Sequence, residues 1–179
     1  MLYFMGEEFS VTPWDVKGDV DYDSLIKEFG VERISSELLK KMQRRSKEMH
    51  FMLRRGIFFA HRDLAWIFEQ YEKGNKFFLY TGRGPSGKMH LGHLMPLVFT
   101  KWLQDVFGVE VWIQFTDDEK FLFRDKSYDE IQKQMHEDFL DVIALGFDAK
   151  KTHFLVDTKH ASLIYPEAIK VAKKLTYST

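Results

Sequence analysis

The chain has 179 residues, 45% of them hydrophobic and 30% charged, with a formal net charge of −1 at pH 7. These values are those of an ordinary globular protein that is long enough to bury a core. The near-zero charge excludes a global basic field, so a nucleic-acid partner would need a local basic patch. The chain has no cysteine, which excludes disulfides, thiolate metal sites and cysteine nucleophiles. No apolar run approaches membrane-spanning length and no signal peptide is evident, so we expect a cytoplasmic protein without a membrane partner.

The first 75 residues have the pattern of a mainly helical extension. Weak alternation of apolar and polar residues near the start predicts a short hairpin. Beyond it, apolar residues recur at helical spacing, with a serine as a candidate first cap and with Gly30 and Gly74 as candidate ends. The expected elements are a hairpin over 9–18 and helices over 21–29, 35–47 and 61–73.

Residues 76–179 alternate apolar, β-branched or aromatic runs with helical patterns. Strands are predicted over 77–81, 109–116 and 152–156, with helices between and after them. This strand–helix–strand order predicts a parallel sheet. We therefore expect an α/β fold, namely the first half of a Rossmann-like nucleotide-binding parallel sheet with helices on both faces. The mainly helical extension, residues 1–75, would precede this incomplete domain.

A glycine-rich segment joins the first predicted strand to the next helix, and it reads Tyr80-Thr81-Gly82-Arg83-Gly84-Pro85-Ser86-Gly87-Lys88-Met89-His90-Leu91-Gly92-His93. At such a junction, backbone N–H groups and the positive end of the helix dipole face one point, which suits a phosphate. The glycines lack a Cβ, so the backbone turns sharply and a nucleotide approaches closely. His90, His93 and Arg83 are the candidate catalytic donors, because they can stabilise the negative charge that develops on a reacting phosphate.

Three ordered blocks of the sequence resemble the tryptophanyl-tRNA synthetases of the eukaryotic and archaeal type, which are class I aminoacyl-tRNA synthetases. The blocks are Leu53 to Asp63, the glycine-rich segment with its His-x-Gly-His string, and Ile113 to Lys120. The resemblance covers about residues 9–159. It implies the ATP-dependent activation of tryptophan to tryptophanyl-adenylate and its transfer to tRNA(Trp), by an enzyme that is expected to be a homodimer. Mg²⁺ would enter with ATP, held by phosphates and water.

The resemblance also implies residues for the amino-acid pocket. Tyr80 and Gln114 would hold the α-amino group, and Glu119 would help to read the indole, whose N–H is a donor only. From the residues alone, Gln114 fits equally well a structural amide bonded to the backbone, because it interrupts an apolar strand. No metal site is expected, since the adjacent Asp117 and Asp118 are interpreted as turn or cap residues. The expected ATP-binding residues are Arg83, Gly84, Pro85, Ser86, His90, Gly92 and His93, and the expected tryptophan-binding residues are Tyr80, Gly82, Gln114 and Glu119.

Two features of the class are not found in this sequence. No lysine-methionine-serine-like string follows the glycine-rich segment, and Thr12 stands where an acidic residue is expected in an N-terminal element of the eukaryotic enzymes. We therefore expect the chain to be the N-terminal portion of such an enzyme and to be inactive alone. The alternatives are a tyrosyl-tRNA synthetase, a small adenylyltransferase with the same His-x-Gly-His string, and a non-catalytic fragment that binds a ligand or a protein. The upstream and downstream blocks disfavour the adenylyltransferase.

Overall fold

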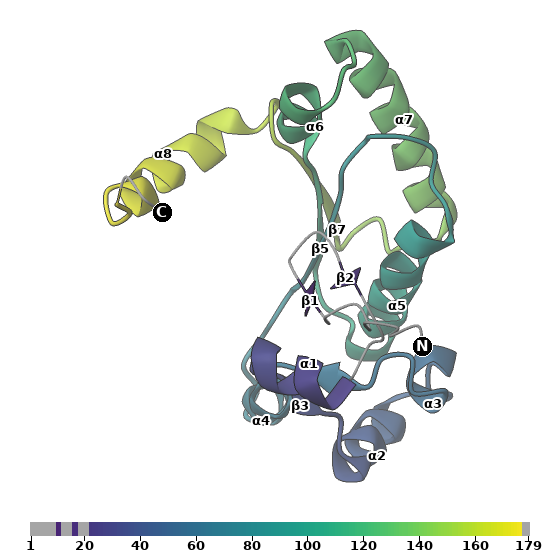
Figure 1. The fold of residues 1–179 in the computed structure, drawn as a ribbon. Helices are drawn as coiled ribbons and strands as arrows, with labels where there is room; N and C mark the ends of the chain where they lie inside the picture. Colours follow the sequence, from purple (N-terminus) through teal and green to yellow (C-terminus); the bar gives the residue numbers. More distant parts are fainter. Residues whose placement is uncertain (1–9, 12–15, 18–21, 177–179) are drawn as a thin grey trace, which may run out of the picture. The chain divides into compact units, whose positions relative to one another are not determined.

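The computed structural model describes residues 10–11, 16–17 and 22–176. Its backbone divides into two compact units, Met1–Glu69 and Gln70–Thr179 (Figure 1). Each unit is described by itself. Among the described residues, no helix is long and apolar enough to cross a bilayer.

The first unit contains short helices and two small antiparallel pairs of strands. Ser35 caps the second helix by accepting a hydrogen bond from the backbone N–H of Leu38, and Gly30 ends the first helix at a positive φ of 57°. The predicted hairpin is present as a strand pair, while residues 12–15 and Gly18 lie outside the described residues. The elements are β1 (Ser10–Val11), β2 (Val16–Lys17), α1 (Tyr22–Phe29), β3 (Glu32–Arg33), α2 (Ser36–Arg45), α3 (Phe51–Arg54), β4 (Ala60–His61) and α4 (Leu64–Glu72).

The second unit is built on a three-stranded parallel sheet with the order β5-β6-β7, as the sequence predicts. Helices alternate with these strands along the chain. The elements are β5 (Leu79–Arg83), α5 (Leu91–Phe107), β6 (Val111–Phe115), α6 (Asp117–Phe123), α7 (Tyr128–Ala144), β7 (Thr152–Val156) and α8 (Ala161–Ala172).

The core of this unit lies on one face of the sheet. Val111, Ile113 and Phe115 alternate along β6 and are all buried, and they cluster with Leu97 of α5 and Met135 of α7. The strand order advances in one direction, so right-handed crossovers place both connecting helices on the same face. Figure 1 shows α5 and α7 on that side of the strands. The intervening residues of β6 therefore point to the opposite face, where the pocket side chains described below are found.

Three parts of the second unit differ from the sequence prediction. The first strand spans Leu79–Arg83 rather than 77–81, and Phe77 packs edge-on against Tyr71 and Phe107 outside the ladder. The second strand spans Val111–Phe115 rather than 109–116. A helix, α6, begins at Asp117, where the sequence predicts turn or cap residues and no helix. Its three acidic residues, 117–119, lie in the first turn, where they interact favourably with the helix dipole.

Candidate active site

The glycine-rich segment links the carboxyl end of β5 to the start of α5, and its last residues cap that helix. His90 is the N-cap, and its Nδ1 accepts a hydrogen bond from the backbone N–H of Gly92 at 3.2 Å. The Nδ1 of His93 accepts from the backbone N–H of His90 at 3.4 Å, which completes a reciprocal capping box. The two imidazole rings lie 3.8 Å apart between centroids. The fold thus brings both predicted histidines to the positive end of a 17-residue helix.

The environment of His93 disfavours the charged form of its imidazole. Burial, together with the nearby charges of Arg83 and His90, lowers the pKa of His93 below its ordinary value. Its Nε2 lies 3.2 Å from the Nη1 of Arg83. The guanidinium and the His90 N–H are both donors, and a neutral imidazole accepts at only one nitrogen, so His93 accepts a hydrogen bond from one of these two groups at a time.

Arg83 occupies the centre of the loop, and it is only 5% exposed. Its Nη1 donates to the carbonyl of Gly84 at 2.7 Å and its Nη2 donates to the carbonyl of Gly87. Its Nε lies 3.1 Å from the Oδ2 of Asp138 on α7, and that carboxyl group is completely buried. Burial raises the pKa of Asp138, although the charge of Arg83 acts in the opposite direction. The Arg83 guanidinium therefore holds the loop in its conformation by bonding to two loop carbonyl groups, a structural role that the sequence does not predict.

A second group of side chains lies against the loop at Gly84. A Cβ at this position would overlap the Cε of Lys120 and lie 3.3 Å from the Oγ1 of Thr116. The Lys120 ammonium donates to Glu119 at 2.8 Å, and Thr116 donates to the other oxygen of the same carboxylate at 3.0 Å. These partners, Lys120 first, lower the pKa of Glu119 against the opposing effect of burial. Glycine at position 84 thus lets Lys120 approach the glycine-rich segment, and Lys120 is not among the site residues that the sequence predicts.

The predicted pocket residues Tyr80 and Gln114 meet at the other face of the sheet. They lie on the same face of neighbouring strands, two residues apart in register, and the Tyr80 hydroxyl donates to the Oε1 of Gln114. Tyr80 is 60% exposed, so this pair is open to a ligand. The Nε2 of Gln114 donates to the Oδ1 of Asp157 at 2.6 Å, directly after β7. The residues alone also allowed a Gln114 amide bonded to the backbone. In the structure, the amide instead bonds to two side chains, those of Tyr80 and Asp157.

Four further residues of the two predicted sets contribute through the backbone: Gly82, Pro85, Ser86 and Gly92. Gly82 lies in β5 opposite Gln114, and a Cβ there would make only ordinary contact with the Gln114 carbonyl, at 3.5 Å. A Cβ at Gly92 would approach the ring of His90 to 3.2 Å, which is tight. Pro85 is buried, and Ser86 donates its N–H to the Gly84 carbonyl, so this part of the loop is a compact turn.

Asp117 links the carboxyl end of β6 to the turn that follows β7. It is completely buried, and its carboxylate accepts from the backbone N–H of Thr158 at 3.1 Å, from the Thr158 hydroxyl and from Gln132 at 2.9 Å. Burial acts to raise its pKa, but these hydrogen bonds outweigh it and hold the pKa below the ordinary value. Within the described residues, no group of three or more His, Asp or Glu side chains is arranged to hold a metal ion.

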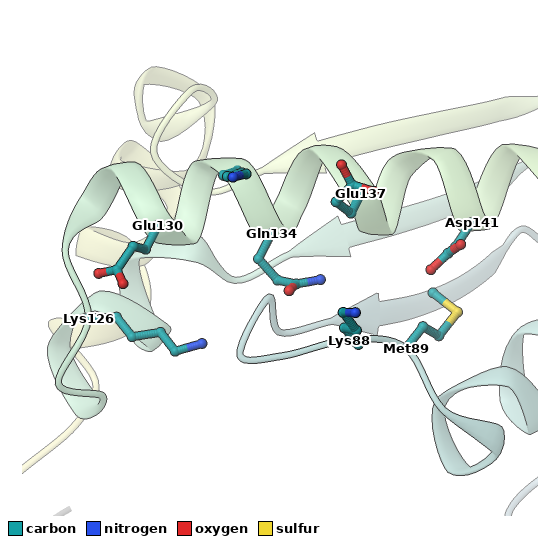
Figure 2. A pocket seen from close by; sticks show the side chains of 8 residues that line it. Lys88, Met89, Lys126, Glu130, Gln134, Glu137 and Asp141 are labelled. Carbon is teal, nitrogen blue, oxygen red and sulfur yellow. The ribbon is translucent and has the colours of Figure 1, made fainter.

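A groove of about 570 Å³ runs along the outer side of the loop, between it and α7. Figure 2 shows Lys88 and Met89 of the loop facing a row of side chains on α7. Lysines and acids alternate around this groove, which therefore has no single sign of charge. Its lining is Lys88, Met89, Lys126, Glu130, Lys133, Gln134, Glu137 and Asp141.

Residues 72–176 match the family described as tRNA synthetases class I (W and Y). This match covers more than half of the chain, and the chain belongs to that family. The sequence is 52% identical over 176 residues to the tryptophan–tRNA ligase of Sulfolobus acidocaldarius, a match that covers 97% of this chain and 46% of that enzyme. The tryptophan–tRNA ligase of Pyrococcus horikoshii is 50% identical, with 97% and 45% covered. The chain thus spans about half the length of the curated relatives that it matches.

Solved structures give the same result. Tryptophanyl-tRNA synthetase from Trypanosoma brucei superposes with a TM-score of 0.83 at 46% identity, covering 88% of this chain and 49% of that one. The enzyme from Encephalitozoon cuniculi, solved bound to tryptophan, gives 0.81 at 36% identity, covering 88% and 47%. The predicted fold class and the predicted resemblance are both confirmed.

Proposed function

We propose that this chain supplies the ATP-binding and amino-acid-binding part of a tryptophan–tRNA ligase that acts in the cytoplasm. In the proposed reaction, the tryptophan carboxylate attacks the α-phosphorus of Mg²⁺-bound ATP. A mixed anhydride bond between the carboxylate and the α-phosphorus forms as the bond to pyrophosphate breaks. The tryptophanyl group then passes to tRNA(Trp), and AMP is released. A homodimer is the assembly proposed for the whole enzyme.

The observation that carries this proposal is the capped start of α5. His90 accepts from the helix with its Nδ1, so its proton is on Nε2, which is free to donate outward. The helix dipole and this N–H then face the place where negative charge builds up on the α-phosphate. One such preformed donor is worth about 3–4 kcal/mol of transition-state stabilisation. Arg83 supports this geometry by fixing the loop carbonyls of Gly84 and Gly87.

The amino-acid pocket is proposed at the carboxyl ends of β5 and β6. Two acceptor groups are available for the two donors of tryptophan: the Tyr80–Gln114 pair and the Glu119 carboxylate. The resemblance to the tryptophanyl-tRNA synthetases implies that Glu119 meets the indole N–H and that the pair meets the ammonium group. Charge favours the reverse assignment, because an ammonium forms its stronger hydrogen bonds with a carboxylate. The structure offers both acceptors, and ligand analogues separate the two assignments.

The test is calorimetric titration of the chain with ATP, tryptophan and tyrosine. We expect ATP and tryptophan to bind and tyrosine to bind much more weakly. Tight binding of tyrosine would favour the tyrosyl alternative, and binding of ATP without either amino acid would favour an adenylyltransferase. If neither ATP nor tryptophan binds, the chain is not the ligand-binding part and the proposal is wrong.

Two analogues then assign the acceptors. Benzothienylalanine has sulfur in place of the indole N–H, and indole-3-propionate lacks the ammonium group. If Glu119 reads the indole, Glu119→Gln lowers the affinity for tryptophan but not for benzothienylalanine. If it holds the ammonium, the same substitution spares indole-3-propionate instead.

A further inference from the structure

We propose that Asp157 is a positioning residue that fixes the amide of Gln114, so that the pocket presents hydrogen-bond acceptors to the amino acid. The inference rests on the proposed function, which it deepens by adding a residue behind the pocket. Asp157 follows the last residue of β7, and its backbone N–H donates to the carbonyl of Phe115 at 3.2 Å. The side chain is thereby held beside β6, next to the strand residue that it contacts.

The chemistry of the three groups determines which way the amide faces. A glutamine side chain can present either an oxygen acceptor or an NH₂ donor in a given direction. Asp157 accepts from the Nε2 of Gln114 at 2.6 Å, and the opposite orientation would place two oxygen atoms against each other. The Oε1 must therefore face Tyr80, whose hydroxyl donates to it. Without Asp157, both amide orientations would be open, because a tyrosine hydroxyl can donate or accept.

The surroundings of Asp157 keep this arrangement independent of its charge. Burial, and the neighbouring carboxyl groups of Asp118 and Asp117, raise the pKa of Asp157, while the bond from Gln114 acts to lower it. A protonated carboxyl group still accepts through its carbonyl oxygen, so Gln114 keeps its partner in either state.

As a result, Gln114 and Tyr80 together present hydrogen-bond acceptors, and these favour a ligand group that donates a hydrogen bond. The Oε1 of Gln114 retains a second lone pair, and the Tyr80 oxygen also has lone pairs available once its proton is directed at Gln114. An indole N–H or an ammonium group satisfies such a site, whereas a ligand with an acceptor at this position would leave unpaired lone pairs facing each other. Asp157 would thus control the selectivity for tryptophan without touching it.

A double-mutant cycle on tryptophan affinity tests this role. In the otherwise unchanged chain, Asp157→Ala is expected to weaken tryptophan binding about tenfold, which corresponds to about 1.4 kcal/mol, while ATP binding changes less than twofold. In the Gln114→Met background, which has no amide to orient, Asp157→Ala should cost nothing further. An equal loss in both backgrounds, or no loss in the first, overturns the proposal.

Two further variants separate positioning from simple destabilisation. Asp157→Asn should retain most of the affinity, because its carbonyl oxygen still accepts from Gln114 while its NH₂ can face Asp118. Thr158→Ala perturbs the same turn by removing a bond to Asp117, so it should lower the melting temperature without changing tryptophan affinity. If Thr158→Ala weakens tryptophan binding as much as Asp157→Ala does, the effect is structural and the proposal fails.

A measurement without ligand distinguishes failure of this inference from failure of the proposed function. The side-chain amide protons of Gln114, assigned by their loss in Gln114→Met, are observed by ¹H–¹⁵N spectroscopy. In the unchanged chain, one of them should be shifted downfield and protected from exchange by Asp157, and both features should disappear in Asp157→Ala. A chain that shows this coupling but binds no tryptophan contradicts the proposed function alone. A chain that binds tryptophan but lacks the coupling contradicts the role of Asp157 alone.

Discussion

Replacing Asp138 by asparagine should strongly destabilise the second unit. The carboxyl group of Asp138 is completely buried, lies 3.1 Å from the Nε of Arg83 and accepts from Gln134 at 3.1 Å. Asparagine has nearly the same shape, so the substitution removes the negative charge without opening a cavity. The guanidinium of Arg83, only 5% exposed, is then left without its counter-charge.

The size of the effect follows from that uncompensated charge. Removing one partner of a buried ion pair costs about 3–5 kcal/mol, far more than the pair contributes relative to an apolar replacement. For a unit of about a hundred residues, 1 kcal/mol lowers the melting temperature by roughly 4 °C. We therefore expect Asp138→Asn to melt at least about 12 °C below the unchanged chain, and to lower the free energy of unfolding by a matching amount.

Thermal and urea unfolding, followed by circular dichroism, measure this loss. The matched control is Asp105→Asn, because Asp105 pairs with Lys101 on the exposed surface of α5, where such pairs contribute less than about 1 kcal/mol. The double replacement Arg83→Met with Asp138→Leu should recover much of the stability, since it removes both charges together. If Asp138→Asn behaves like Asp105→Asn, Arg83 is not held by a buried pair and the loop is not anchored as described.

Three further outcomes follow from the site. In whichever form of the protein shows activity, His93→Ala should lower kcat far more than it weakens tryptophan binding. The reason is that charge develops on the phosphate mainly in the transition state. A raised KM with unchanged kcat would indicate a binding role for His93. Glu119→Ala should cost about 1.5–3 kcal/mol in tryptophan affinity, with little effect on ATP affinity. If the preference for tryptophan over phenylalanine narrows, Glu119 contacts the indole. If that preference is unchanged, Glu119 contacts the ammonium group. The lowered pKa of Asp117 means that its contribution to stability is present above its unfolded pKa, about 4, and is lost as the pH falls through its lower folded pKa. The melting temperature of Asp117→Asn should therefore fall less steeply with acid than that of the unchanged chain, and parallel curves would contradict this assignment.

The sequence predicted the parts of the fold that depend on local signals. The strand Thr152–Val156 is predicted to the residue, and helix ends at Gly30 and Gly108 coincide with left-handed glycines at φ of 57° and 62°. Ser127 caps α7 as expected. These signals act over a few residues, through periodicity, capping and the conformational freedom of glycine, and so they can be read without knowing the tertiary structure.

The buried acids were not predicted, because their partners lie far away along the chain. Arg83 and Asp138 are separated by 55 positions, and Gln114 and Asp157 by 43. Nothing in the local sequence distinguishes such an aspartate from a solvated one on a helix or in a turn. The sequence predicts turn or cap residues at Asp117 and Asp118, because adjacent acids at a strand end are common in such places. Asp117 in fact accepts four hydrogen bonds, two from Thr158, one from Gln132 and one from the Tyr128 hydroxyl, and the bonds from Thr158 form only once β7 lies beside β6.

Together these acids would hold the proposed pocket in one arrangement before a ligand binds. Asp138 anchors the loop after β5 through Arg83, Asp117 joins the start of α6 to the turn after β7, and Asp157 joins that turn to Gln114. Each strand of the sheet therefore has its carboxyl end tied to another element by a buried or half-buried carboxyl group. Donors and acceptors fixed in this way need little reorganisation when charge develops, and this is the condition under which they stabilise a transition state most strongly. Loss of any one anchor should consequently affect catalysis more than its distance from the substrate would indicate.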